Sequence, residues 1–178
     1  MKIGRLFIIL LAAIAVFSIS GEAQTKKPVR KTTPAKRTGA TLPPLDVRAA
    51  RVKVSNQLAN VSAFTSRLGP IAQAIEALDA ESKTKKLRKE TLDKNAADKQ
   101  KVVAAIRGLR EGMVKLESEF RVKPDLKKYL PMIQGISDLA GQSEASAIAG
   151  KFVAANAPLK TVQQKLNDTL TAMPNAEL

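Results

Sequence analysis

Apolar residues recur every seven positions through the first part of the body of this chain, and this repeat limits the fold more than any other feature. One series consists of Val47, Val54, Val61, Leu68 and Ile75, and a second, three residues later, consists of Ala50, Gln57, Phe64, Ile71 and Leu78. Two such series form one stripe along a helix, the seam by which helices pack in coiled coils. The chain must therefore bury this stripe against other helices.

The seam crosses Gly69 and Pro70, which could end one helix and begin the next. Proline inside a helix costs about 3 kcal/mol. Full burial of one Leu or Ile stabilises by roughly 1.5 to 3 kcal/mol, so the apolar residues on both sides can offset that cost. Because an inserted loop would usually shift the heptad phase, we expect one long helix with a kink at Pro70. The alternative is a helix stop at Gly69.

Three further helical segments follow the same kind of spacing. The helices are predicted at about 45–80, 83–122, 125–140 and 143–173. The segment Asn95 to Asp98 resembles a capping box, which could restart the second helix there. The last segment alternates steps of three and four residues from Ala145 to Met173, and it does so through Pro158, where a second kink is expected.

No segment shows the alternation of a strand, so the fold class is all-α. We expect an elongated antiparallel bundle of three to four long helices with coiled-coil-like packing, or an oligomer if the seams stay partly open. The core must form almost without aromatic residues, because the body contains only three Phe and one Tyr and the chain has no Trp.

The first 23 residues are typical of a secretory signal peptide. A short basic start precedes an apolar run from Leu6 to Ile19, which is shorter than the roughly 20 residues of a membrane-spanning helix. Small residues predict cleavage before Gln24, and an uncleaved anchor is the alternative. The sequence therefore predicts a periplasmic or secreted protein, and without cysteine it has no disulfides.

Residues 24–44 are basic, rich in Pro and Thr and poor in apolar residues, which predicts a disordered linker before the helical domain at 45–178. This segment has no acidic residue and contains six cations, namely Lys26, Lys27, Arg30, Lys31, Lys36 and Arg37. It could bind anionic polymers, or it could be only a solvated spacer.

A second basic cluster lies at residues 83–101, with eight basic and three acidic residues. Its candidate polyanion-binding residues are Lys83, Lys85, Lys86, Arg88 and Lys89. Such a cluster could attach the protein to an anionic polymer, an acidic protein or lipid headgroups. The alternative is a solvated face near the end of a helical hairpin.

The residue types argue against catalysis and against a bound metal or cofactor. The chain has no His and no Cys, which removes the commonest general base and the usual ligands of haem, zinc and iron–sulfur clusters. The carboxylates are spaced as surface partners of Lys and Arg one helical turn away, as in Glu117 with Arg121. We therefore expect no enzyme and no cofactor.

These features favour a non-catalytic interaction or scaffold protein of the cell envelope, which binds anionic polymer, lipid headgroups or an acidic partner through its basic segments. One alternative is a periplasmic holdase-type chaperone, a class that this chain is similar to in composition only. Another is an amphipathic helical protein that binds lipid surfaces, so that any membrane contact would be peripheral. A homo-oligomer is compatible with each hypothesis, whereas sequence-specific nucleic-acid binding is disfavoured because aromatic residues are scarce.

Overall fold

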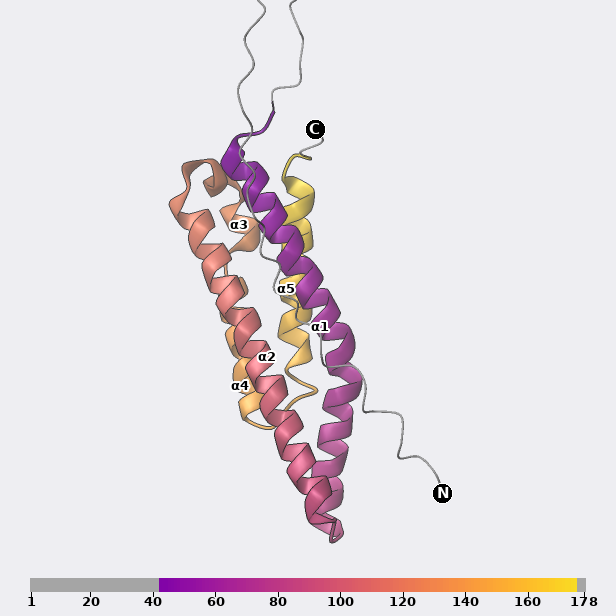
Figure 1. The fold of residues 1–178 in the computed structure, drawn as a ribbon. Coiled ribbons are helices and arrows are strands. Elements are labelled where there is room, and N and C mark those ends of the chain that lie inside the picture. The colour runs from indigo at the N-terminus through magenta and orange to yellow at the C-terminus, as the bar shows by residue number, and fades with distance from the viewer. Residues whose placement is uncertain (1–41, 176–178) are drawn as a thin grey trace, which may run out of the picture. The chain divides into compact units, whose positions relative to one another are not determined.

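The computed structural model describes residues 42–175, which belong to one compact unit, and every regular element in this part of the chain is helical. Figure 1 shows the order of the elements along the chain. They are α1 (Leu45–Thr84), α2 (Lys89–Val122), the 3₁₀ helix η1 (Pro124–Tyr129), α3 (Leu130–Ile133), α4 (Ile136–Ile148) and α5 (Asn156–Ala172). The all-α prediction is confirmed for these residues.

The first helix, α1, is continuous through Gly69 and Pro70. The whole first series of the predicted seam is buried on its inner face. The second series is buried only in part, since Phe64, Ile71 and Leu78 are half-buried. The interpretation that one long helix passes through the proline is therefore correct, and a helix stop at Gly69 is wrong.

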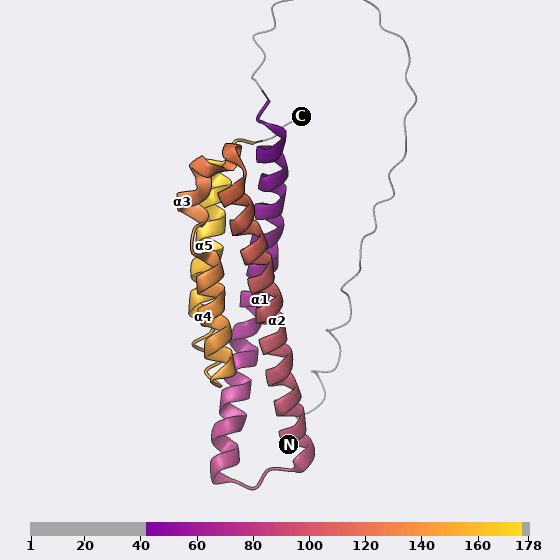
Figure 2. The same ribbon diagram turned by 90° about the vertical axis from the view of Figure 1, so that its left-hand side faces the viewer.

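The helices α1 and α2 run antiparallel and form a hairpin (Figure 2). α1 extends four residues beyond the predicted end at 80, and α2 starts at Lys89 instead of 83. α2 passes without interruption through Asn95 and Asp98, so the possible restart of the helix at that point does not occur.

The predicted helix at 125–140 is divided into shorter elements. Pro124 begins a single 3₁₀ segment, α3 has only four residues, and the chain then turns at Gly135 with φ of +85°. This left-handed conformation suits glycine, which has no Cβ to clash. The turn directs α4 back along α2, and α4 continues through residues 141–143, where the sequence suggested a break.

The predicted helix at 143–173 is also two helices, separated at residues 149–155. Pro158 is the third residue of α5 and lies in its first turn. A proline at that position removes no intrahelical hydrogen bond, because the first N–H groups of a helix have no partner in the helix. The predicted kink at Pro158 is therefore wrong, and the proline belongs to a helix start.

The shorter helices cover one side of the hairpin. α4 packs along α2, and α5 packs against α1 and α4. The buried core contains Phe120 and Phe152 and is otherwise formed mainly by aliphatic residues. Figure 2 shows that the α1–α2 hairpin continues past the loop between α4 and α5, so its far end consists of two helices only. Over residues 42–175, none of the helices has the length and apolarity needed to cross a membrane.

Candidate polyanion interface

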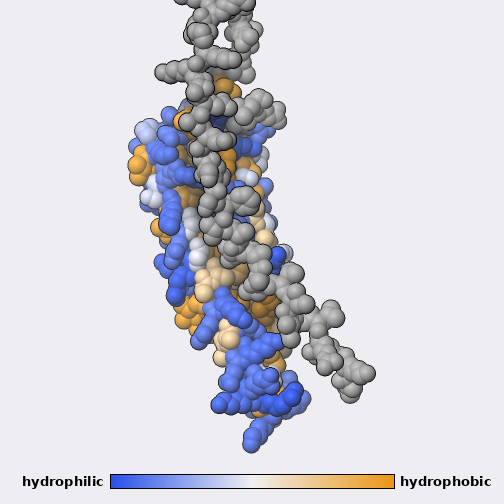
Figure 3. Space-filling model, in the orientation of Figure 1, coloured by the Kyte–Doolittle hydropathy of each residue, from blue (hydrophilic) through white to orange (hydrophobic). Residues whose placement is uncertain are grey.

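The far end of the hairpin, residues 83–89, carries a dense group of cations, and we call these seven residues the hairpin tip. Five of the seven are basic and none is acidic. The five are Lys83, Lys85, Lys86, Arg88 and Lys89, and all are exposed. Figure 3 shows hydrophilic surface gathered at this end of the hairpin. The fold therefore brings together the five body cations that the sequence singled out.

Most of the tip cations have no anionic partner within the described part of the chain. Lys85 forms an ion pair with Glu81, with 3.1 Å between Nζ and Oε1. Both side chains are exposed, so this pair contributes little to stability. The other four cations form no ion pair with a residue that the structure describes. They are therefore available to an external anion.

The two helix ends at the tip differ in how well they accommodate cations. Lys83 lies in the last turn of α1, where the negative end of the helix dipole favours a positive charge. Lys89 is the first residue of α2 and follows Arg88, so both lie at the positive end of that helix. Cations there are disfavoured, and an anion bound beside these N–H groups would be favoured.

A polar cluster holds the hairpin in register close to the tip. Asn95 is 5% exposed, and its Nδ2 donates to Oδ1 of Asp79 at 2.8 Å. Nζ of Lys99 lies 2.6 Å from the same oxygen. A buried Asn within a helical seam fixes how two helices pair. Asn95 thus connects α2 to α1, a role different from the helix cap that the sequence suggested.

The six cations of the basic tail, Lys26 to Arg37, lie outside the described residues. Their expected role stays a prediction.

Glu117 is buried, although the sequence placed it as a surface ion-pair partner. It forms the predicted pair with Arg121, but its side chain is only 3% exposed. Burial by itself raises the pKa of this carboxyl, yet hydrogen bonds from Arg121, Gly135 and Ser137 outweigh that effect and lower the pKa to about 2. The carboxylate accepts from the backbone N–H groups at the start of α4, so it caps that helix.

Glu144 is a second buried carboxylate, and it joins α4 to α2. It accepts from Nε of Arg107 at 2.7 Å and from Nη1 of Arg110 at 3.0 Å. Arg107 lowers the pKa of Glu144 most, burial opposes this shift, and Arg110 lowers the pKa further. The spacing of Glu144 from Ala140 and Ala147 places it on the buried face of α4. The sequence pattern does not reveal this residue, because the predicted apolar series of this helix starts at Ala145, which is exposed.

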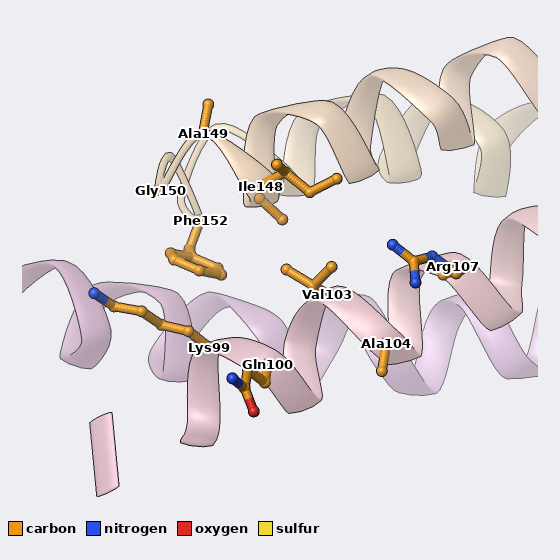
Figure 4. A pocket seen from close by; sticks show the side chains of 10 residues that line it. Lys99, Gln100, Val103, Ala104, Arg107, Ile148, Ala149, Gly150 and Phe152 are labelled. Carbon is orange, nitrogen blue, oxygen red and sulfur yellow. The ribbon is translucent and has the colours of Figure 1, made fainter. Parts of the chain in front are cut away.

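A groove of about 620 Å³ lies where α4 ends, between α2 and the α4–α5 loop. Val103, Ile148 and Phe152 form its apolar part, and Figure 4 shows these three side chains facing one another across it. Lys99 and Arg107 line it at either end, and no carboxylate residue lines it. The sequence pattern does not predict this groove, because the groove depends on the break between α4 and α5.

The described residues contain two candidate binding surfaces, a cationic tip and an apolar groove with cations at its ends. Within residues 42–175, no three acidic, His or Cys side chains lie close enough together to hold a metal ion. No family model, curated protein or solved structure matches this chain. The proposals below therefore rest on the geometry of the chain itself.

Proposed function

We propose that this chain is a non-catalytic, exported helical protein that binds an anionic polymer of the cell envelope. The hairpin tip and the basic tail are the binding elements, and the helical body is the rigid support that presents the tip. Periplasmic or secreted location follows from the signal peptide expected at residues 1–23. The protein needs no cofactor for this role.

One observation carries the proposal, namely the concentration of unpaired cations at the tip. Five basic residues lie within a segment of seven, and four of them form no ion pair inside the described part of the chain. Like charges held this close repel one another, and a polyanion would relieve the repulsion along several contacts at once. The formal net charge of +14 at pH 7 adds attraction over a longer range.

The polar cluster behind the tip supports the same function. Asp79 and Asn95 tie the two helices together, which limits how far the tip cations can rearrange. A fixed array loses less entropy on binding than a flexible one. The hairpin is therefore suited to hold an extended chain of negative charges.

The salt dependence of binding to a polyanion tests the mechanism. A fluorescently labelled polyphosphate chain is titrated with the purified protein at increasing ionic strength. We expect affinity to fall about tenfold or more between roughly 0.05 and 0.3 M salt, because exposed charges are screened within about 10 Å at 0.1 M. Affinity that does not change with salt contradicts the proposal. Salt-independent binding of unfolded client proteins would instead favour the holdase-type chaperone.

An anionic lipid surface is the second candidate, and two leucines near the tip favour it. Leu87 is half-buried within the tip, and Leu92 is 41% exposed in the first turn of α2. Apolar side chains among cations suit a membrane surface, where the cations meet headgroups and the leucines enter the interface. Sedimentation with phosphatidylglycerol vesicles measures binding of the protein to an anionic lipid surface. If replacing both leucines by Ser weakens vesicle binding but leaves polyphosphate binding unchanged, the lipid surface becomes the better assignment.

A further inference from the structure

Large apolar side chains are exposed at the end of the helical body opposite to the hairpin tip. Leu45 begins α1 and is 72% exposed, and Val122 ends α2 and is 74% exposed. Leu42, just before α1, and Met132 on α3 are exposed as well. We call these four residues the apolar base. Exposed apolar side chains that gather in this way mark surfaces that contact another protein or a membrane.

Specific contacts hold the segments of the base together. Nζ of Lys123 lies 2.9 Å from Oδ1 of Asp46, which joins the end of α2 to the start of α1. Nη1 of Arg51 on α1 donates to the carbonyl oxygen of Met173, just after α5, at 2.7 Å, and α3 packs against α5. Figures 1 and 2 show these helix ends and α3 together at one end. The base is therefore broader than the tip, which consists of two helices only.

The arrangement of the base suits a flat surface. Its four members come from the start of α1, the end of α2 and α3, so they do not form the single stripe on which a partner helix packs. Separate side chains that project from a broad end can each enter the interface of a bilayer, which needs no groove. Figure 3 shows hydrophobic patches beside hydrophilic surface at this end.

Cations beside the base indicate which kind of lipid surface it fits. Lys127 and Lys128 of η1 are exposed, and neither forms an ion pair with a residue that the structure describes. Asp46 and Glu119, the acids nearest to the end of α2, are already paired with lysines. Asp125 is exposed and offsets one of the two η1 lysines. The charge of η1 itself is therefore positive.

The chain that precedes the described residues adds more positive charge at the same end. Residues 24–41 lead directly into Leu42 and contain six cations and no acid. All six lie within sixteen residues of the base along the chain. Lys and Arg held close to a membrane surface strengthen binding to anionic lipids. The occupant that fits both the apolar side chains and the charge is an anionic lipid surface.

We propose that the apolar base docks on an anionic lipid membrane. Its four apolar side chains enter the interface, and the neighbouring cations meet the lipid headgroups. The hairpin tip, at the other end of α1 and α2, then points away from the membrane and toward a polymer. The proposal uses none of the tip residues, so it stands or falls independently of polyphosphate binding.

Single tryptophans test which surface meets the lipid, because the chain has no Trp of its own. Val122→Trp places a fluorophore at the base, and Val114→Trp places one eight residues, or about 12 Å, away along α2. Side chains at a membrane interface are buried by about 5 to 10 Å, so position 114 should stay in water. With phosphatidylglycerol vesicles, we expect the emission of the Val122→Trp variant to shift to shorter wavelength and that of the Val114→Trp variant to stay unchanged. No shift at position 122, or equal shifts at both positions, overturns the proposal.

Vesicle sedimentation measures how much the apolar side chains contribute. One variant combines Leu45→Ser with Val122→Ser at the base, and the control combines Val114→Ser with Val153→Ser on α2 and the α4–α5 loop. All four side chains are exposed, so both variants should fold. We expect the base variant to lose at least tenfold in affinity for phosphatidylglycerol vesicles and the control to stay within twofold. No loss in the base variant, or equal losses in the two, overturns the proposal.

Three further results would assign a different partner or surface. If Leu92→Trp shifts with vesicles while Val122→Trp does not, the lipid meets the tip and the proposal is wrong. It is also wrong if phosphatidylcholine vesicles bind as tightly as phosphatidylglycerol vesicles, because the cations then contribute nothing. If the base variant lowers the mass of an oligomer in solution and leaves vesicle binding unchanged, the base joins copies of this chain and the membrane proposal is overturned.

Discussion

Glu117 of α2 accepts two hydrogen bonds from Ser137 of α4, one from its backbone N–H at 3.2 Å and one from its hydroxyl at 2.8 Å. A third comes from the N–H of Gly135 at 3.1 Å. A carboxylate from α2 thus caps the N-terminus of α4. The first residue of α4, Ile136, lies nineteen positions after Glu117 in the sequence. This contact fixes the reversal after α3 and the line along which α4 packs on α2.

Replacing Glu117 by Ala should destabilise the protein. The N–H groups of Gly135 and Ser137 would lose their acceptor, and an unmatched buried polar group costs about 1 to 3 kcal/mol. The free energy of unfolding, from urea denaturation followed by circular dichroism, measures this change. Glu111→Ala is the control, because Glu111 is exposed on the same helix, and it should change stability by no more than about 0.5 kcal/mol. Equal effects of the two substitutions would show that the cap contributes nothing.

Glu117 should also make stability depend on pH in the acid range. Its pKa is about 2 in the folded protein, against an ordinary value of 4.5. Between these two pH values the folded state therefore binds fewer protons than the unfolded state. Its stabilisation, roughly 3 kcal/mol, is complete above pH 4.5 and is lost as the pH falls toward 2. Stability measured across this range should fall less in Glu117→Gln than in the wild type. Parallel curves for the two proteins contradict the assignment.

The sequence predicted the helical class and the buried series on α1, because heptad spacing reports directly which residues face a partner helix. It did not predict where α4 begins and ends. The turn at Gly135 depends on the cap from Glu117, a contact between segments that lie far apart along the chain. Within the break at residues 149–155, the apolar residues Phe152 and Ala155 keep the helical spacing of the residues on either side. Spacing alone could therefore not reveal the break.

The tip cations were recognised as a group from the sequence because they are contiguous. Their position at the end of a hairpin followed from the predicted turn, although the turn lies at residues 85–88 and both helices have different bounds from those expected. The groove between α2 and the α4–α5 loop was missed because it combines residues from α2 with residues from a loop that spacing did not predict. The cluster of Asp79, Asn95 and Lys99 was missed for a related reason, since it joins two helices.

Pro70 should cost stability in its present position. It lies inside α1, where a proline lacks the N–H for one helical hydrogen bond and its ring crowds the preceding turn. Pro70→Ala should therefore raise the free energy of unfolding, by up to about 3 kcal/mol. The side chain is exposed, so little packing is lost. A lower stability of Pro70→Ala would mean instead that the packing of α1 requires the distortion that proline imposes.

Two glycines should respond to alanine in opposite directions. Gly135 has φ of +85°, a conformation that costs an L-residue about 1 to 2 kcal/mol, so Gly135→Ala should destabilise by that amount. Gly108 lies inside α2, and a Cβ added there meets nothing within 4 Å. Gly108→Ala should stabilise by roughly 0.5 to 1 kcal/mol. Thermal unfolding of both variants beside the wild type checks the pair, and shifts of the same sign would contradict this account of Gly135.

Direct comparison of two charge-matched variants tests the proposed role of the hairpin tip. One variant neutralises to Gln the four tip cations that form no ion pair with a described residue, namely Lys83, Lys86, Arg88 and Lys89. The other neutralises three Lys and one Arg that are exposed elsewhere on the helices, namely Arg67, Lys115, Lys127 and Lys160. Both lose the same formal charge and both keep the basic tail, so only the position of the lost charge differs.

The measurement is the affinity of each variant for labelled polyphosphate at roughly 0.1 M salt, where charges more than about 10 Å apart are largely screened. We predict that the tip variant loses at least tenfold in affinity and that the matched variant stays within threefold of the wild type. Equal losses in the two variants would contradict the account, because binding would then depend on net charge and not on the cations at the hairpin tip.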